Sequence, residues 1–240
     1  MAKTANSKET TKFRTLQIKN YSFKYLRKPE KHFNKNSDFS ELKKIIKYRD
    51  IKEGLYEGGF KLWEGTIDLL EFLITSKFDF DGKTVLDLGC GHGLLGIWAM
   101  KNKAKLVYLQ DFNENVLRIA TKKNIELNKC SNKDFELVAG DWSNKKFLGK
   151  LKKNKFDVIL TSETIYTPKN EKLVIKWIHK LLKRNGTAFV SAKRFYFGTG
   201  GSFLSFKALC SPSKLDAEDV KCRCDGKSNI RQILKITKTD

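Results

Sequence analysis

Four acidic side chains stand at or just after the ends of short apolar runs: Asp87, Asp111, Asp141 and Glu163. Apolar runs of this length are typical of buried parallel strands. In an open α/β sheet the ligand binds at the carboxyl ends of such strands, so we expect the four carboxylates to gather around one site. Carboxylates in that position can accept hydrogen bonds from the hydroxyl and amino groups of a ligand.

A glycine-dense turn accompanies the first of these acids. Residues 83–96 read KTVLDLGCGHGLLG, in which an expected strand runs into a turn with Gly89, Gly91 and Gly93. Glycine lets the backbone approach a ligand where any Cβ would clash. Asp87 can accept hydrogen bonds from the ligand or hold the amides of the turn. We therefore expect the nucleotide-binding edge of an α/β sheet, with S-adenosylmethionine as the ligand.

A dinucleotide is the competing ligand, because the same turn satisfies the G-x-G-x-x-G pattern and Asp111 follows at the spacing of a ribose-binding acid. A dinucleotide needs helix amides that face a pyrophosphate, whereas S-adenosylmethionine has no phosphate. Asp87 before the first glycine and Asp141 after a third strand favour a methyltransferase over a dehydrogenase.

The apolar periodicity predicts five β/α units followed by a closing hairpin. This is the plan of a Rossmann-like α/β fold, the seven-stranded class I methyltransferase sheet with helices on both faces. The expected helices cover residues 62–74, 113–127 and 168–183, the last closed by Asn185-Gly186. The expected strands cover residues 84–88, 105–110, 135–139, 156–161 and 187–192, with the hairpin at 220–224 and 230–237.

The N-terminal quarter differs in composition from the rest. Residues 1–50 carry 14 Lys or Arg against five Asp or Glu and show no clear strand or heptad period. We expect a basic, loosely structured extension there, with a short amphipathic helix around residues 42–49. Residues 51–240 have the size of one S-adenosylmethionine-dependent methyltransferase domain.

The formal net charge of the chain is +21. Such a field favours nucleic acid, ribonucleoprotein or acidic surfaces as partners. A composition that is generally rich in Lys and Asn explains the same charge equally well. Residues 1–30 are polar, so we expect no signal peptide and no membrane partner.

Five scattered cysteines predict reduced thiols in an intracellular protein, either cytoplasmic or nuclear or both. Cys222-x-Cys224 suits packing on one strand face better than zinc binding. No histidine spacing indicates metal ligation. We expect a monomer without a metal.

The run at residues 54–70, GLYEGGFKLWEGTIDLL, resembles the histidine protein methyltransferases of the methyltransferase-like group. That family shows G-x-Y-E-G-G-x-K-x-W-E-x-T ahead of the glycine turn. The resemblance covers about residues 54–201 and departs at Gly65, where the family often has cysteine. Further matches follow in the family's order at residues 110–112 (QDF), 140–143 (GDWS), 160–166 (LTSETIY) and 191–201 (SAKRFYFGTGG).

The resemblance implies S-adenosylmethionine-dependent methylation of a histidine ring nitrogen in a protein. The best-known target of this family is a large-subunit ribosomal protein. The implied partner is therefore a ribosomal protein or a pre-ribosomal particle, to which the basic surface could add non-specific contact with RNA.

The expected cofactor site has two acids in distinct roles. Asp111 should accept both ribose hydroxyls, and Asp141 should accept the adenine amino group beside the ring of Trp142. The complete set of expected cofactor-binding residues is Leu62, Trp63, Glu64, Gly65, Thr66, Asp87, Gly89, Gly91, Gln110, Asp111, Phe112, Gly140, Asp141, Trp142 and Ser162.

The expected catalytic residues are Glu163, Tyr166 and Tyr196. Methyl transfer is an in-line displacement, so alignment is the main task of the enzyme. A neutral imidazole already offers a lone pair. A carboxylate, for which Glu163 is the candidate, would hold the other ring nitrogen as N–H and stabilise the imidazolium that forms. The two tyrosines would position the ring.

Three other functions stay open. Glu163-x-x-Tyr166 resembles the acid-x-x-tyrosine element of protein-lysine methyltransferases, in which Asp is the usual acid. A nucleic-acid methyltransferase would suit the charge but lacks the expected Pro-Pro-aromatic turn after strand four. A non-catalytic ribosome- or RNA-binding module is the third, and the acids at three strand ends argue against it.

Overall fold

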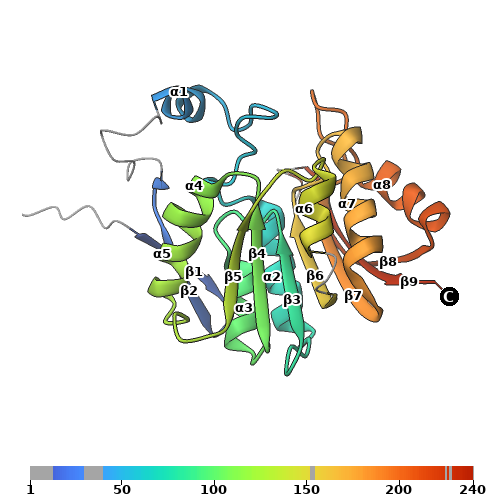
Figure 1. Cartoon of the computed structure of the whole chain (residues 1–240), viewed down its shortest axis with the longest axis horizontal. Coiled ribbons are helices and arrows are strands. Elements are labelled where there is room, and N and C mark those ends of the chain that lie inside the picture. Colours follow the sequence, from blue (N-terminus) through green and yellow to red (C-terminus); the bar gives the residue numbers. More distant parts are fainter. Residues whose placement is uncertain (1–12, 30–39, 152–154, 225, 227–228, 240) are drawn as a thin grey trace, which may run out of the picture.

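The computed structural model describes residues 13–29, 40–151, 155–224, 226 and 229–239 (Figure 1). A seven-stranded sheet in the order β5-β4-β3-β6-β7-β9-β8 forms its centre. The strands from β5 to β7 are parallel, and β9 runs antiparallel to both of its neighbours. The predicted α/β sheet with its closing hairpin is thereby confirmed. The strands are β3 (Thr84–Leu88), β4 (Leu106–Asp111), β5 (Phe135–Ala139), β6 (Phe156–Ser162), β7 (Leu182–Lys193), β8 (Leu215–Arg223) and β9 (Arg231–Lys238).

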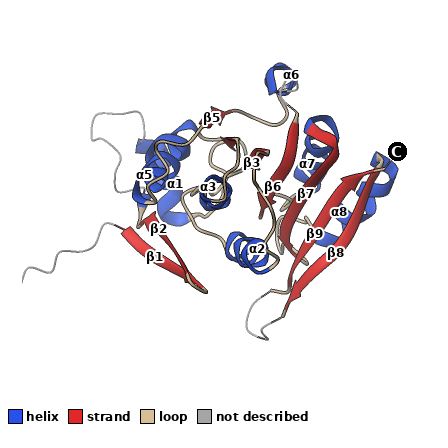
Figure 2. Ribbon diagram, turned by 90° about the horizontal axis from the view of Figure 1, so that it is seen from below, coloured by secondary structure: helices blue, strands red, loops and turns tan. Residues whose placement is uncertain are grey.

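Helices cover both faces of this sheet (Figure 2). Successive residues of a strand point to opposite faces, so Val85 packs into one apolar cluster and Leu86 into the other. One face carries α2 (Glu64–Thr75), α3 (Leu94–Lys101) and α5 (Lys122–Leu127). A short helix, α4 (Glu114–Val116), and a π-helical turn (Leu117–Thr121) lead directly into α5. The other face carries α6 (Lys145–Leu151), α7 (Pro168–Leu181) and α8 (Phe203–Cys210), which a 3-10 turn, η3 (Ser211–Ser213), follows.

The end of α7 differs from the sequence prediction. The helix begins as expected, with Pro168 in its first turn and the Thr167 side chain accepting a hydrogen bond from the Asn170 amide. It ends at Leu181 instead of at the Asn185-Gly186 pair. Gly186 lies inside β7, where an added Cβ would come 2.9 Å from the Asp157 carbonyl oxygen. The glycine therefore serves close strand packing and does not stop the helix.

The prediction that residues 1–50 are loosely structured is wrong for the parts of the segment that form regular elements, residues 13–26 and 40–48; residues 1–12 and 30–39 lie outside the described residues. Strands β1 (Phe13–Ile18) and β2 (Tyr21–Leu26) pair antiparallel in a separate hairpin (Figure 2). Helix α1 (Ser40–Tyr48) is the short amphipathic helix that the sequence predicts, and its Ile45 and Ile46 pack against a buried apolar cluster. Both elements therefore lie against the main domain.

Two asparagines of α5 and its end hold the hairpin. The Asn124 Oδ1 accepts a hydrogen bond from the Leu26 amide at 2.7 Å. The Asn128 side chain bonds both the amide and the carbonyl of Lys24, at 3.1 and 2.6 Å. The outer edge of β2 has no neighbouring strand, so its backbone N–H and C=O groups need other hydrogen-bond partners. The side chains of Asn124 and Asn128 supply them.

Replacing Asn124 with alanine should lower the free energy of unfolding by about 1–3 kcal/mol, because the Leu26 amide and the His92 ring each lose a buried partner. Urea denaturation measures the change. The exposed Lys122→Ala on the same helix is the control and should stay within about 0.5 kcal/mol of the parent. An Asn124→Ala protein as stable as the parent would show that this side chain does not anchor the hairpin.

Candidate functional site

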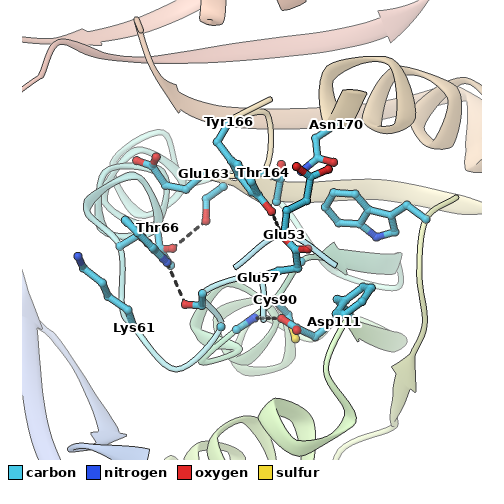
Figure 3. A pocket seen from close by; sticks show the side chains of 18 of the residues that line it. Glu53, Glu57, Lys61, Thr66, Cys90, Asp111, Glu163, Thr164, Tyr166 and Asn170 are labelled. Carbon is cyan, nitrogen blue, oxygen red and sulfur yellow. Dashed lines mark hydrogen bonds between the residues drawn. The ribbon is translucent and has the colours of Figure 1, made fainter. Parts of the chain in front are cut away.

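A pocket lies at the carboxyl ends of β3, β4, β5 and β6 (Figure 3). Residues 53–63, here called the strap, form most of the remaining wall, and the start of α7 completes it. Most of the predicted site residues line this pocket. They are Leu62, Trp63, Thr66, Gly89, Gly91, Asp111, Phe112, Gly140, Asp141, Trp142, Ser162, Glu163 and Tyr166.

Asp111 is a buried carboxylate in the pocket wall. Its Oδ2 accepts a hydrogen bond from the Gly91 amide at 3.0 Å, and its Oδ1 accepts one from the Asn113 amide at 3.1 Å. Burial raises the pKa of Asp111 to about 6, although these amides oppose the shift. The carboxylate is thus held in one orientation in the pocket wall, and its contact with the ribose stays a prediction.

Asp87 lies beneath the glycine turn and is not part of the pocket lining. It is 1% exposed, and its Oδ2 accepts a hydrogen bond from the Gly96 amide in the first turn of α3 at 2.9 Å. Burial raises its pKa to about 7, and the neighbouring Asp111 adds to the shift. Asp87 therefore does not face the ligand; it holds one backbone amide at the start of α3, directly after the glycine turn.

Gln110 also stands behind the pocket, where it orients an aromatic wall. It is fully buried, and its Oε1 accepts a hydrogen bond from Trp142 Nε1 at 2.7 Å. Its Nε2 donates to the Gly140 carbonyl at 2.9 Å. Trp142 and Phe112 line the pocket, and the Asp141 carboxylate stands at its exposed rim. This end of the pocket can hold a flat aromatic ring.

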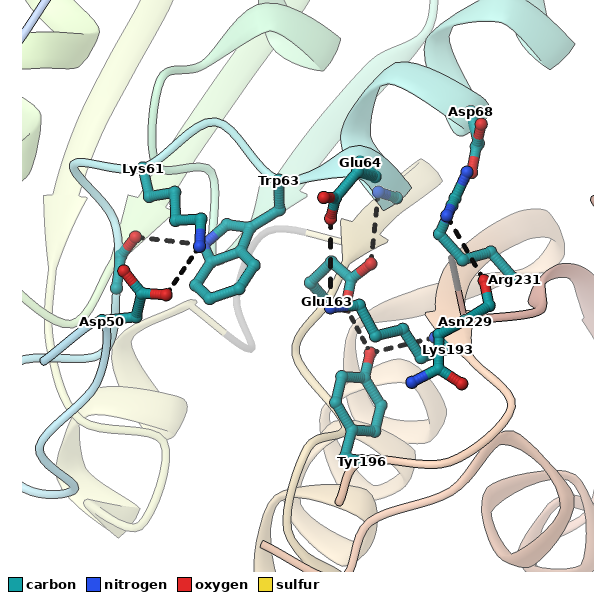
Figure 4. Close-up of polar contacts among 12 residues, drawn as sticks. Asp50, Lys61, Trp63, Glu64, Asp68, Glu163, Lys193, Tyr196, Asn229 and Arg231 are labelled. Atoms are coloured by element: carbon teal, nitrogen blue, oxygen red, sulfur yellow. Dashed lines mark hydrogen bonds and ion pairs between the residues drawn. The ribbon is translucent and has the colours of Figure 1, made fainter. Parts of the chain in front are cut away.

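Glu163 directly follows β6, and its carboxylate lies between the start of α2 and the segment after β7 (Figure 4). Its backbone is left-handed, with φ of +57°, which is uncommon for a residue with a Cβ. One carboxylate oxygen accepts a hydrogen bond from the Gly65 amide at the start of α2 at 3.2 Å. The other accepts one from the Tyr196 hydroxyl at 2.8 Å. Burial raises the pKa of this carboxyl, and the Tyr196 bond and Lys193 oppose that rise.

Gly65 and Tyr196 therefore support Glu163 and do not line the pocket. A Cβ on Gly65 would lie 2.6 Å from Glu163 Oε1. A cysteine at this position, which the family often has, would need the carboxylate to lie elsewhere. Glu64, also expected at the cofactor, is exposed and lies 3.9 Å from the Lys193 ammonium.

Tyr166 lines the pocket, and its hydroxyl is bonded to an acid of the strap. Its hydroxyl donates to Glu57 in the strap, whose other carboxylate oxygen accepts from the Gly54 amide at 2.6 Å. Burial raises the pKa of Glu57. An ion pair of 3.3 Å between Lys169 and Glu53 lies beside this contact. Two polar contacts thus join the strap to the segment after β6.

Sequence reasoning missed Glu57 as a site residue, although it stands in the E-G-G element on which the resemblance rests. The other pocket-lining residues that it did not select are Glu53, Gly54, Gly58, Gly59, Lys61, Cys90, His92, Thr164, Lys169, Asn170 and Leu173. Most of these belong to the strap or to the start of α7.

His92 is a structural residue at the base of the strap. Its Nε2 lies 3.0 Å from the Phe60 carbonyl oxygen, and its Nδ1 lies 3.0 Å from the amide nitrogen of Asn124. Burial lowers its pKa to about 4, so the ring is neutral near pH 7. A neutral ring with its proton on Nε2 satisfies both contacts.

Within the described residues, no group of three or more His, Cys, Asp or Glu side chains could hold a metal ion. No helix in this part of the chain is both long and apolar enough to span a bilayer. Cys222 and Cys224 are exposed, so the expectation that they serve packing is wrong.

A sequence family described as lysine methyltransferase matches residues 45–199, well over half of the chain. The chain belongs to this methyltransferase family. A histidine protein methyltransferase 1 homolog from Dictyostelium discoideum is 39% identical over 199 residues, which cover 82% of this chain and 63% of that protein. A protein-lysine N-methyltransferase from Saccharomyces cerevisiae is 33% identical over 152 residues, which cover 54% of this chain and 35% of that protein. The chain spans less than two thirds of the length of either relative.

Solved structures show the same fold as this chain. The magnesium protoporphyrin IX methyltransferase of Synechocystis, solved with bound S-adenosylmethionine, superposes with a TM-score of 0.56 at 18% identity. The match covers 72% of this chain and 78% of that one. The likeness confirms the class I methyltransferase fold.

The cofactor of such a methyltransferase is S-adenosylmethionine, and the pocket fits it. Asp111 is a buried acceptor for hydroxyl groups, and Trp142 and Phe112 flank the neighbouring space. The Gly96 amide, one of the amides at the start of α3 to which a pyrophosphate could bind, is bonded to the Asp87 carboxylate instead. The helix start therefore suits a cofactor without phosphate.

The affinity for S-adenosylmethionine should depend on pH through Asp111. Only the ionised carboxylate can accept two hydroxyl hydrogen bonds, and the pKa in the free protein is about 6. The dissociation constant should therefore rise as the pH falls below that value, by up to about tenfold per pH unit. Calorimetric titration across this range measures it.

Asp111→Asn should bind S-adenosylmethionine at least about tenfold more weakly and lose this pH break, since a neutral amide accepts less strongly. Asp87→Asn is the matched control, because its amide oxygen can still accept from Gly96 and it does not line the pocket. For Asp87→Asn, the dissociation constant for S-adenosylmethionine should still rise as the pH falls below the pKa of Asp111, as it does for the parent. Equal affinity of Asp111→Asn and the parent would contradict the ribose assignment.

Proposed function

We propose that this methyltransferase transfers a methyl group from S-adenosylmethionine to a ring nitrogen of a histidine in a protein. One observation carries the proposal. The buried Glu163 carboxylate stands in the pocket wall, held by the Gly65 amide and the Tyr196 hydroxyl. A carboxylate fixed in this way can orient an imidazole N–H.

The chemistry divides between cofactor and chain. S-adenosylmethionine, when bound, supplies an electrophilic methyl group on a sulfonium sulfur. The Glu163 carboxylate accepts a hydrogen bond from one ring N–H of the substrate, which leaves the lone pair of the other nitrogen free to attack. The methylated ring is a cation, which the carboxylate stabilises until the ring proton passes to water.

Two neighbours keep Glu163 suited to this role. The Lys193 ammonium lowers the carboxyl pKa against the effect of burial and so favours the ionised form. The pKa of the Tyr196 hydroxyl is raised well above its usual value by burial and by Glu163, so the hydroxyl stays protonated and donates. Tyr166, bonded to Glu57, supplies an aromatic wall against which a ring can be aligned.

The protein target in this proposal is a large-subunit ribosomal protein, alone or in a pre-ribosomal particle. The histidine-methyltransferase motif at residues 54–70 supports it, and the net charge of +21 suits approach to a particle rich in phosphate. A monomeric enzyme in the cytoplasm or nucleus fits this target.

Protein-lysine methylation is the second candidate. The family description and the yeast relative favour it. A lysine ammonium must lose a proton before it can attack, which adds a requirement that imidazole does not have. The Dictyostelium relative matches this chain at higher identity and over more of its length, and we therefore place histidine first.

The enzyme should transfer labelled methyl groups from S-adenosylmethionine into ribosomes or ribosomal precursors from cells that lack it. After hydrolysis to amino acids, the label should appear in methylhistidine. Glu163→Gln should lower kcat about 100-fold because the amide cannot stabilise the imidazolium. Label in methyllysine or in RNA would replace this proposal with the corresponding alternative.

Gly65→Ala should slow methyl transfer about 10- to 100-fold because the new Cβ displaces the Glu163 carboxylate. Affinity for S-adenosylmethionine should stay within about twofold, since Gly65 does not line the pocket. Gly149→Ala in α6, where an added Cβ meets nothing within 4 Å, is the matched control and should leave the rate unchanged. A Gly65→Ala enzyme with the parental rate would show that the position of Glu163 does not limit transfer.

A further inference from the structure

Helix α7 presents a row of lysines on one side. Lys169, Lys172, Lys176 and Lys180 follow one another at intervals of three and four residues, which places them on a single helical face. Most of the apolar residues between them are buried and belong to the apolar cluster on this side of the sheet. Figure 1 shows α7 on the same side of the sheet as α6 and α8.

Three further lysines from other elements gather at the far end of this row. Lys155 precedes β6, and its ammonium donates to the Lys180 carbonyl at 2.5 Å. Lys214 and Lys238 lie close enough to act with Lys155 and Lys180 on His179, and together with burial they lower the pKa of its ring. We call Lys155, Lys172, Lys176, Lys180, Lys214 and Lys238 the lysine face.

No acid neutralises the lysine face. The single carboxylate of α7, Glu171, is buried and accepts hydrogen bonds from the Ser202 amide and the Ser205 hydroxyl, each at 2.7 Å. In the part of the chain that the structure describes, none of the six lysines forms an ion pair with a carboxylate. By contrast, Lys169 at the start of the row pairs with Glu53, and Lys183 in β7, just beyond the end of α7, pairs with Asp157.

We propose that the lysine face binds the phosphate backbone of RNA. Like charges held together repel one another, so a polyanion that neutralises them gains free energy on binding and releases counterions. The 14 residues of α7 span about 21 Å, enough to contact several successive phosphates. A regular line of point charges matches a regular line of phosphates and selects no base sequence.

The composition of the lysine face favours RNA over other acidic partners. All six cations are lysines, which attract phosphates as point charges and need no fixed geometry of paired hydrogen bonds. A membrane surface would also call for exposed aromatic or large apolar side chains beside the lysines. None of the exposed large hydrophobic residues of the described chain lies on α7.

The row begins at the pocket. Lys169 lines the pocket mouth, and Lys172 stands one turn further along α7. RNA bound along this helix would hold a ribonucleoprotein with one end at the methyl-transfer site. This last link rests on the proposed function, whereas RNA binding by the lysine face does not.

Fluorescence anisotropy with a labelled, unstructured oligouridylate of about 20 nucleotides tests the proposal over a series of salt concentrations. The test variant combines Lys172→Glu, Lys176→Glu and Lys180→Glu. The matched control combines Lys122→Glu, Lys129→Glu and Lys133→Glu, which make the same change in charge at exposed positions on α5 and the turn after it. Circular dichroism and S-adenosylmethionine binding verify that each variant folds, and the same three α7 positions changed to glutamine give a second test variant.

The parent should bind this RNA with an affinity that falls as salt rises. The α7 variant should bind at least about tenfold more weakly, with a salt slope reduced by about 2, and the control should stay within about threefold of the parent. Equal loss in both variants would assign RNA binding to net charge alone and overturn the proposal. Absence of RNA binding, or tighter binding to polyglutamate or to anionic vesicles, would also overturn it. These outcomes are independent of methyl transfer.

Discussion

The buried charge of Asp111 is the constraint around which the pocket is built. Removing a carboxylate from water costs free energy unless hydrogen bonds replace the lost hydration. The amides of Gly91 and Asn113 supply those bonds and thereby tie the glycine turn to the start of α4. The Asn113 side chain in turn bonds the Leu55 carbonyl and the Glu57 amide. One buried acid thus sets the positions of the turn, the end of β4 and the strap.

Glu163 repeats this arrangement at the end of β6. Its left-handed backbone is a strained conformation of the kind that persists where surrounding contacts over-determine it. Those contacts come from the start of α2, through Gly65, and from the segment after β7, through Tyr196. The two acids therefore stand at the ends of β4 and β6, on either side of β3, and each is held by different supports. The contact between Tyr166 and Glu57 joins their supports across the pocket.

The strands of the main sheet could be predicted because buried parallel strands are short, nearly continuous apolar runs. The N-terminal hairpin could not, because the apolar residues of β1 do not alternate regularly and because the partners of its outer edge, Asn124 and Asn128, lie about a hundred residues away. The end of α7 was misjudged for a similar reason. An Asn-Gly pair is a common helix stop, but Gly186 is required by the neighbouring Asp157 carbonyl, which local sequence does not reveal.

The sequence by itself determined the fold, the cofactor class and the edge of the sheet at which the acids gather, because apolar period and glycine spacing are local properties of the chain. The tertiary structure alone decided which of these residues face the pocket. Asp87 and Gln110 stand at the same strand ends as pocket residues but turn toward Gly96 and Trp142. Tyr166 turns toward an acid of the strap. The direction of a side chain depends on partners that folding brings from distant segments. The spacing of residues along the chain does not reveal those partners.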